Sequence, residues 1–72
     1  MVLDEALREQ LAQQDPEFRH LLEEHRARDR RLKELSGKGW LTGEEEQEEK
    51  RLKKEKLQLK DQMEALLRRR AS

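Results

Sequence analysis

The two histidines are the side chains of this sequence best suited to acid–base or metal chemistry near neutral pH. His20 and His25 are five positions apart, so on a helix they lie on different faces and cannot bind one metal ion together. His25 and Asp29 are four positions apart and share a face, which is compatible with a metal pair or an acid–base pair. We favour a different interpretation, in which His25 is a polar position of a helix–helix interface and sets its register.

No other pattern indicates catalysis or a bound cofactor. The segment 36–39 contains a Gly-Lys pair, but it lacks the glycine spacing of a P-loop, and neither serine nor threonine follows Lys38. A flexible turn is the better interpretation. The chain has no cysteine, which excludes disulfides, thiolate metal sites and a cysteine nucleophile. We therefore expect a protein that is not an enzyme, with no cofactor, no metal and no small-molecule substrate.

Cations in two separate segments are compatible with a nucleic-acid site. If the segments pair in antiparallel fashion, one basic patch forms from Arg26, Arg30, Lys50, Lys53 and Lys54. Phosphate contacts need only such cations. However, 17 lysines and arginines balance 17 aspartates and glutamates, and no aromatic residue is interleaved for base stacking. A solvated surface of ion pairs is the favoured interpretation, and a nucleic-acid or ribosome-associated factor is the alternative.

The composition is typical of long helices and coiled coils. Of the 72 residues, 47% are charged and 32% hydrophobic, and most are good helix formers. No apolar run approaches the roughly 20 residues of a membrane span. The acidic first residues lack the basic start of a signal peptide. We expect a cytoplasmic, all-α protein that does not enter a membrane.

The periodicity of apolar residues predicts three helices. A short one covers about residues 3–14, and two longer ones cover about 16–35 and 43–70, with a loop at 36–42 between them. The short helix has a leucine at every fourth position. These leucines are Leu3, Leu7 and Leu11.

Capping residues mark the ends of these helices. Pro16 fits the first turn of a helix, and Asp15 before it can accept hydrogen bonds from unpaired N–H groups. Two separate helices are the favoured interpretation here, and one helix kinked at the proline is the alternative. Gly37 is placed to end the second helix in the left-handed conformation. Thr42 and Glu45 have the spacing of a capping box.

Apolar residues spaced three and four apart along both longer helices predict the surface that joins them, which we call the seam. The seam consists of Phe18, Leu21, Leu22, His25, Leu32, Leu35, Leu52, Leu59, Met63 and Leu66. Joined by a short loop, the two helices should fold back on one another. The expected fold is an antiparallel, coiled-coil-like helical hairpin with a short N-terminal helix, a single domain over 1–72. Leu57 falls off the seam and is either a tolerated surface leucine or part of a second contact face.

The neighbours of His25 should set its protonation. If cations such as Arg28 and Lys56 flank it, its pKa should fall below the ordinary value, and protonation in mild acid should loosen the hairpin.

About ten large apolar side chains are few for a stable hairpin, and self-association is the simplest remedy. We therefore expect a homodimer or higher oligomer, with another helical protein as a further candidate partner. The function expected is helix–helix self-association and protein–protein interaction. Trp40 and Leu41 at the loop tip are a candidate docking site, but the favoured interpretation is that Trp40 packs over the end of the hairpin or makes a crystal or oligomer contact.

Three stretches also support a family resemblance: FRHLLEEH at 18–25, DRRL at 29–32 and LKKEKLQLKDQM at 52–63. Together they resemble the YdcH-like family of small bacterial proteins over about residues 15–67. The resemblance implies a helical hairpin in a family of unknown function, and it carries over no catalytic residue. The family pattern usually has leucine three residues after its histidine. Arg28 stands there in this chain, which puts an arginine on the seam and weakens its middle.

Overall fold

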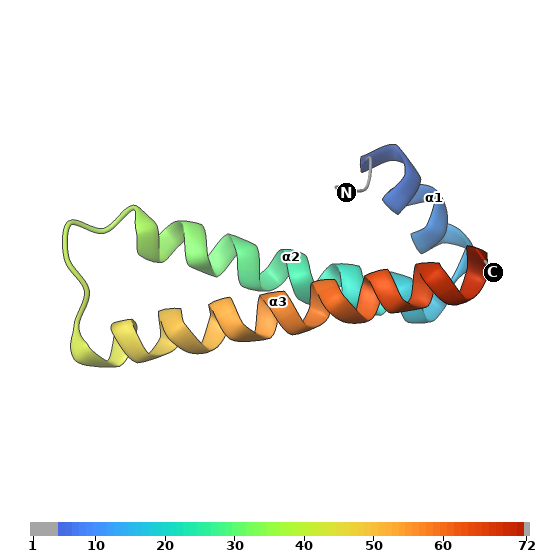
Figure 1. Ribbon diagram of the computed structural model, residues 1–72. Coiled ribbons are helices and arrows are strands. Elements are labelled where there is room, and N and C mark those ends of the chain that lie inside the picture. The colour runs from blue at the N-terminus through green and yellow to red at the C-terminus, as the bar shows by residue number, and fades with distance from the viewer. Residues whose placement is uncertain (1–4, 72) are drawn as a thin grey trace.

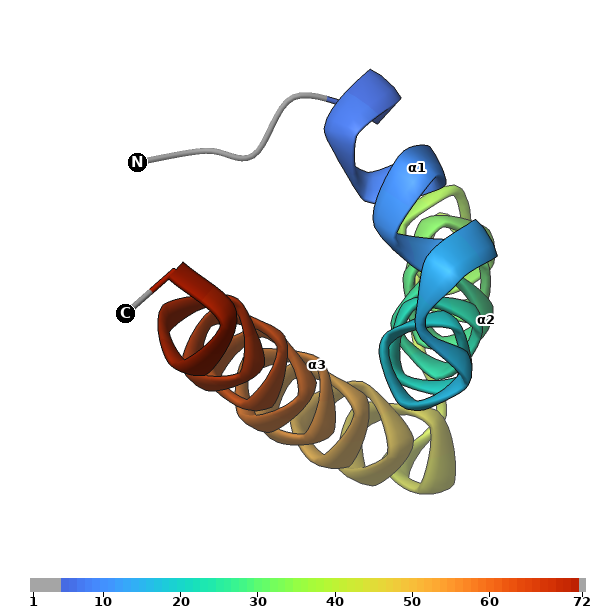
Figure 2. The ribbon, with the colours of Figure 1, turned by 90° about the vertical axis from the view of Figure 1, so that its right-hand side faces the viewer.

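The computed structural model describes residues 5–71 and shows three helices over that range (Figure 1). They are α1 (Glu5–Gln14), α2 (Pro16–Ser36) and α3 (Gly43–Ala71). The helices α2 and α3 lie side by side and run antiparallel, and α1 turns back at their open end and packs on α2 (Figure 2). The predicted fold, an all-α hairpin with a short N-terminal helix, is confirmed. Leu3, the expected start of the first helix, lies outside the described residues.

The break between α1 and α2 occurs at Asp15. Its backbone is extended, with φ −128° and ψ 106°, which no continuous helix allows. Its carboxylate accepts hydrogen bonds from the backbone N–H groups of Glu17 (3.0 Å) and Phe18 (3.3 Å). The N-cap prediction is therefore confirmed, and the alternative of one kinked helix is wrong.

The capping box at the start of α3 is also confirmed. The Thr42 hydroxyl accepts a hydrogen bond from the Glu45 backbone N–H (3.1 Å), and the Glu45 carboxylate accepts one from the Thr42 backbone N–H (3.0 Å). Lys38 in the loop pairs with the same carboxylate. These hydrogen bonds, that of Lys38 foremost, lower the pKa of Glu45 to about 2. The loop is thus tied to α3 by its own residues.

Gly37, however, does not adopt the expected left-handed conformation. With φ −78° and ψ −8° it continues the right-handed backbone of α2. Its N–H donates to the carbonyl oxygens of Lys33 (3.1 Å) and Glu34 (3.2 Å). The prediction of a left-handed cap was wrong because these bonds close the last turn without a change in the sign of φ.

The conformation of Gly37 leads to a stability prediction. An added Cβ would lie 3.6 Å from the carbonyl oxygens of Lys33 and Glu34, an ordinary van der Waals distance. Gly37→Ala should therefore raise the free energy of unfolding by about 0.4–1 kcal/mol, because alanine restricts the unfolded chain. Urea unfolding followed by circular dichroism measures this change. A loss of stability instead would indicate that Gly37 has a left-handed backbone conformation in solution.

The apolar core is concentrated at the open end of the hairpin. One buried cluster joins all three helices and consists of Ala12, Phe18, Leu22, Met63 and Leu66, with Leu11, Leu21 and Leu67 packed against it. Leu35 and Leu52 are also buried. The other seam residues, His25, Leu32 and Leu59, are only half-buried. The middle of the hairpin is therefore less apolar than its ends.

Within the part of the chain that the structure describes, no helix is long and apolar enough to cross a membrane.

Candidate interaction groove

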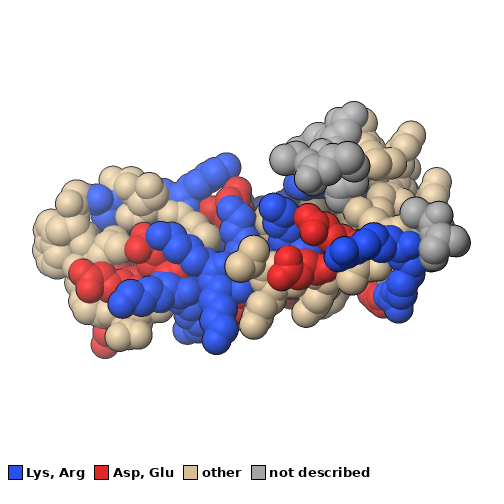
Figure 3. All heavy atoms as spheres, in the orientation of Figure 1, with Lys and Arg blue, Asp and Glu red and all other residues tan. Residues whose placement is uncertain are grey.

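Charged side chains join α2 and α3 across the middle of the hairpin. The cross-helix pairs are Arg28 with Glu55 (2.9 Å), Lys56 with Asp29 (2.6 Å) and Arg31 with Glu48 (2.9 Å). Arg28, the residue expected to weaken the seam, also bonds Glu24 in its own helix. Polar contacts thus replace apolar packing along this stretch. In the space-filling view, basic side chains gather over the middle of the hairpin with acidic ones beside them (Figure 3).

Hydrogen bonds from these cations lower the pKa of several carboxyl groups. A hydrogen bond from Arg28 lowers the pKa of Glu24, and one from Lys56 is the main cause that lowers the pKa of Asp29. A carboxyl group that stays ionised near neutral pH is a poor general acid.

Among residues 5–71, no three His, Cys, Asp or Glu side chains are grouped as a metal site would require.

His25 lies half-buried between the two helices. Burial lowers its pKa, and the positive charges of Lys56, Arg8 and Lys60 lower it further, against the opposing effect of Asp29. The predicted direction is confirmed, and Lys56 is one of the expected causes. Arg28, the other expected cause, does not contribute, because its guanidinium bonds Glu55 and Glu24. Arg8 was missed because its position depends on how α1 folds back.

The lowered pKa of His25 makes stability depend on pH. The folded state favours the neutral imidazole, so its contribution is fully present above the unfolded pKa of about 6.5 and is lost as pH falls below it. We expect the urea midpoint to fall between pH 7.5 and pH 5.5, values on either side of about 6.5. His25→Gln should remove most of this change. His20→Gln, at an exposed position of α2, is the matched control and should retain it.

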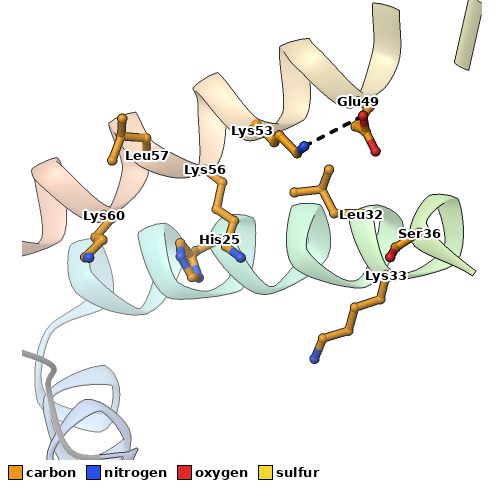
Figure 4. A pocket seen from close by; sticks show the side chains of 9 residues that line it. All are labelled: His25, Leu32, Lys33, Ser36, Glu49, Lys53, Lys56, Leu57 and Lys60. Atoms are coloured by element: carbon orange, nitrogen blue, oxygen red, sulfur yellow. Dashed lines mark ion pairs between the residues drawn. The ribbon is translucent and has the colours of Figure 1, made fainter. Parts of the chain in front are cut away.

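An open groove runs between α2 and α3 beside His25 (Figure 4). Leu32 and Leu57 give it an apolar lining, and charged side chains line it from both helices. The charged ones are Lys33, Glu49, Lys53, Lys56 and Lys60. Leu57 is 59% exposed, and it belongs to this groove rather than to the cluster at the open end. An apolar strip bordered by charges is suited to holding another helix.

The sequence signalled only part of this groove. The prediction singled out His25 and Leu32 as seam residues and Leu57 as off the seam. It did not place Lys33 and Lys60 at a groove, because in the sequence they are ordinary lysines of charged helices. Only the pairing of the two helices brings them to one groove.

The residues of the predicted basic patch are divided between ion pairs and open surface. Arg26 bonds Glu9 of α1, and Lys53 lies 3.7 Å from Glu49. The remaining three are exposed, namely Arg30, Lys50 and Lys54. Nucleic-acid binding through them stays a prediction.

The loop tip presents its aromatic residue to solvent. Trp40 is 76% exposed, whereas Leu41 is half-buried. The favoured prediction that Trp40 packs over the end of the hairpin is therefore wrong, and a contact of Trp40 with another copy stays a prediction. Docking of a partner at this tip stays a prediction.

Comparison with known proteins places the hairpin in a family. Residues 18–67 match the family described as "Protein of unknown function (DUF465)". No curated protein and no solved structure matches the chain. The matched range runs from Phe18 in the first turn of α2 to Leu67 near the end of α3. It therefore includes both arms of the hairpin and the whole groove, and the chain belongs to this family of proteins of unknown function.

Proposed function

We propose that this protein is non-enzymatic and acts through helix–helix association, with a second copy of itself as the partner. The groove beside α3 carries the proposal. Leu57 is 59% exposed there and Leu32 is half-buried. A helix laid in the groove would remove both from water, and full burial of a leucine contributes about 1.5–3 kcal/mol.

The surface area of the chain supports association. The chain exposes 5523 Å² and measures 44 × 22 × 18 Å. A compact monomer of 8.7 kDa would expose ~4700 Å². The excess of ~800 Å² equals the area that one partner buries in an interface of standard size.

Sedimentation velocity over a range of micromolar concentrations tests this proposal. We expect a dimer that dissociates on dilution. Leu57→Ala should raise the dissociation constant at least about tenfold, because the apolar contact is made twice in a symmetric dimer. Gln58→Ala, at an exposed neighbour that does not line the groove, is the matched control. A monomer at every concentration would refute self-association.

We also propose that the family is the YdcH-like family of small bacterial proteins. The three stretches that resemble it, at 18–25, 29–32 and 52–63, all lie within the matched range 18–67. Their motifs fall on the two facing helices of the hairpin, as the resemblance implies.

A further inference from the structure

The charges that line the groove from α3 change sign from one end to the other. Glu49 lies at the end near the loop, and Lys60 lies at the opposite end. They are eleven positions apart, which is three turns of helix and ~16 Å. The two side chains therefore share one face of α3, with the groove leucine between them.

The lysines of the groove differ in the ion pairs that they make within the chain. Lys56 binds Asp29 at 2.6 Å, and Lys33 lies 3.2 Å from the same carboxylate. Lys53 lies 3.7 Å from Glu49. For Lys60, the residues between 5 and 71 provide no ion pair.

The surroundings of Lys60 reinforce this positive end. The positive charges of Lys56, Arg8 and Lys60, which come from two different helices, act on His25. Asp29 is the acidic group that opposes them, and it is already bound by two lysines. An approaching carboxylate would be attracted to this end of the groove.

We propose that the second copy lies on the groove with its α3 antiparallel, so that Glu49 of each copy pairs with Lys60 of the other. This inference rests on the self-association proposed above. A two-fold axis between residues 54 and 55 produces both pairs at once, since such an interface uses the same patch on each copy. In this register Leu57 of one copy lies near Lys53 of the other, whose aliphatic stem covers it. This register covers the apolar strip of the groove and gives Lys60 an ion-pair partner at the same time.

Charge reversal tests this register. Lys60→Glu and Glu49→Lys should each raise the dissociation constant at least about tenfold, because each places like charges opposite one another. An equimolar mixture of the two variants should recover association to within about threefold of the unaltered protein. In the mixed dimer both pairs between positions 49 and 60 are again of opposite sign. Sedimentation velocity measures both effects, with circular dichroism to verify helix content.

Lys54→Glu makes the same charge change at an exposed lysine that does not line the groove, and it should leave association unchanged. If the unaltered protein is a monomer, both this inference and the proposed function fail. If it dimerises but neither reversal weakens it, self-association stands and this register is wrong. If the single variants weaken the dimer but the mixture does not recover, the Glu49–Lys60 pairing is refuted.

Discussion

Replacing Phe18 by alanine is expected to lower the free energy of unfolding by about 3–5 kcal/mol, the usual cost of removing a buried aromatic ring. Phe18 is 1% exposed and belongs to the cluster that joins all three helices. Ala12 of α1 and Met63 and Leu66 of α3 are members of the same cluster. The cavity left by the missing ring would therefore weaken the packing of α2 against α1 and against α3 at the same time. Small domains have only about 5–15 kcal/mol of stability, so this loss is a large fraction of the total.

Urea unfolding followed by circular dichroism measures this loss, at one fixed protein concentration because association would shift the transition. Leu7→Ala is the control, since Leu7 is 42% exposed and surface substitutions usually change stability by less than about 0.5 kcal/mol. Equal losses in the two variants would show that the cluster at the open end does not hold the fold together.

At the other end of the hairpin, Leu35→Ala is expected to lower the free energy of unfolding by about 2–5 kcal/mol. Leu35 is 1% exposed and lies in the last turn of α2. The ion pairs between Arg31 and Glu48 lie one turn away but remain partly exposed, and exposed pairs contribute only about 0–1 kcal/mol. Apolar burial should therefore dominate the stability of this end.

The comparison variant is Arg31→Ala, which removes the ion pairs and leaves the leucine in place. Thermal and urea unfolding of both variants should rank Leu35→Ala as far more damaging. The reverse order would mean that charged pairs, rather than buried leucine, close the hairpin near its loop.

Much of the local structure was predictable from sequence because it depends on residues within one helical turn. Asp15 caps α2 through the N–H groups of Glu17 and Phe18, and Thr42 and Glu45 exchange their hydrogen bonds across three positions. The leucine periodicity and a short loop likewise predict a hairpin, since two apolar faces joined this closely bury one another. Even local reasoning was wrong at Gly37, where a right-handed turn satisfies the same carbonyl groups without a change of sign in φ.

What the sequence alone determined is therefore where α1 ends, where α2 and α3 begin and end, and that these two helices pair. Tertiary structure decided which charges meet across the hairpin, as in the bond between Arg28 and Glu55, and that α1 adds Ala12 to the core. It also decided that Leu32 and Leu57 line one groove with lysines from both arms. These contacts join residues up to dozens of positions apart, and their partners depend on helix register and rotation. Those two quantities come from packing the whole hairpin, and no short stretch of sequence contains them.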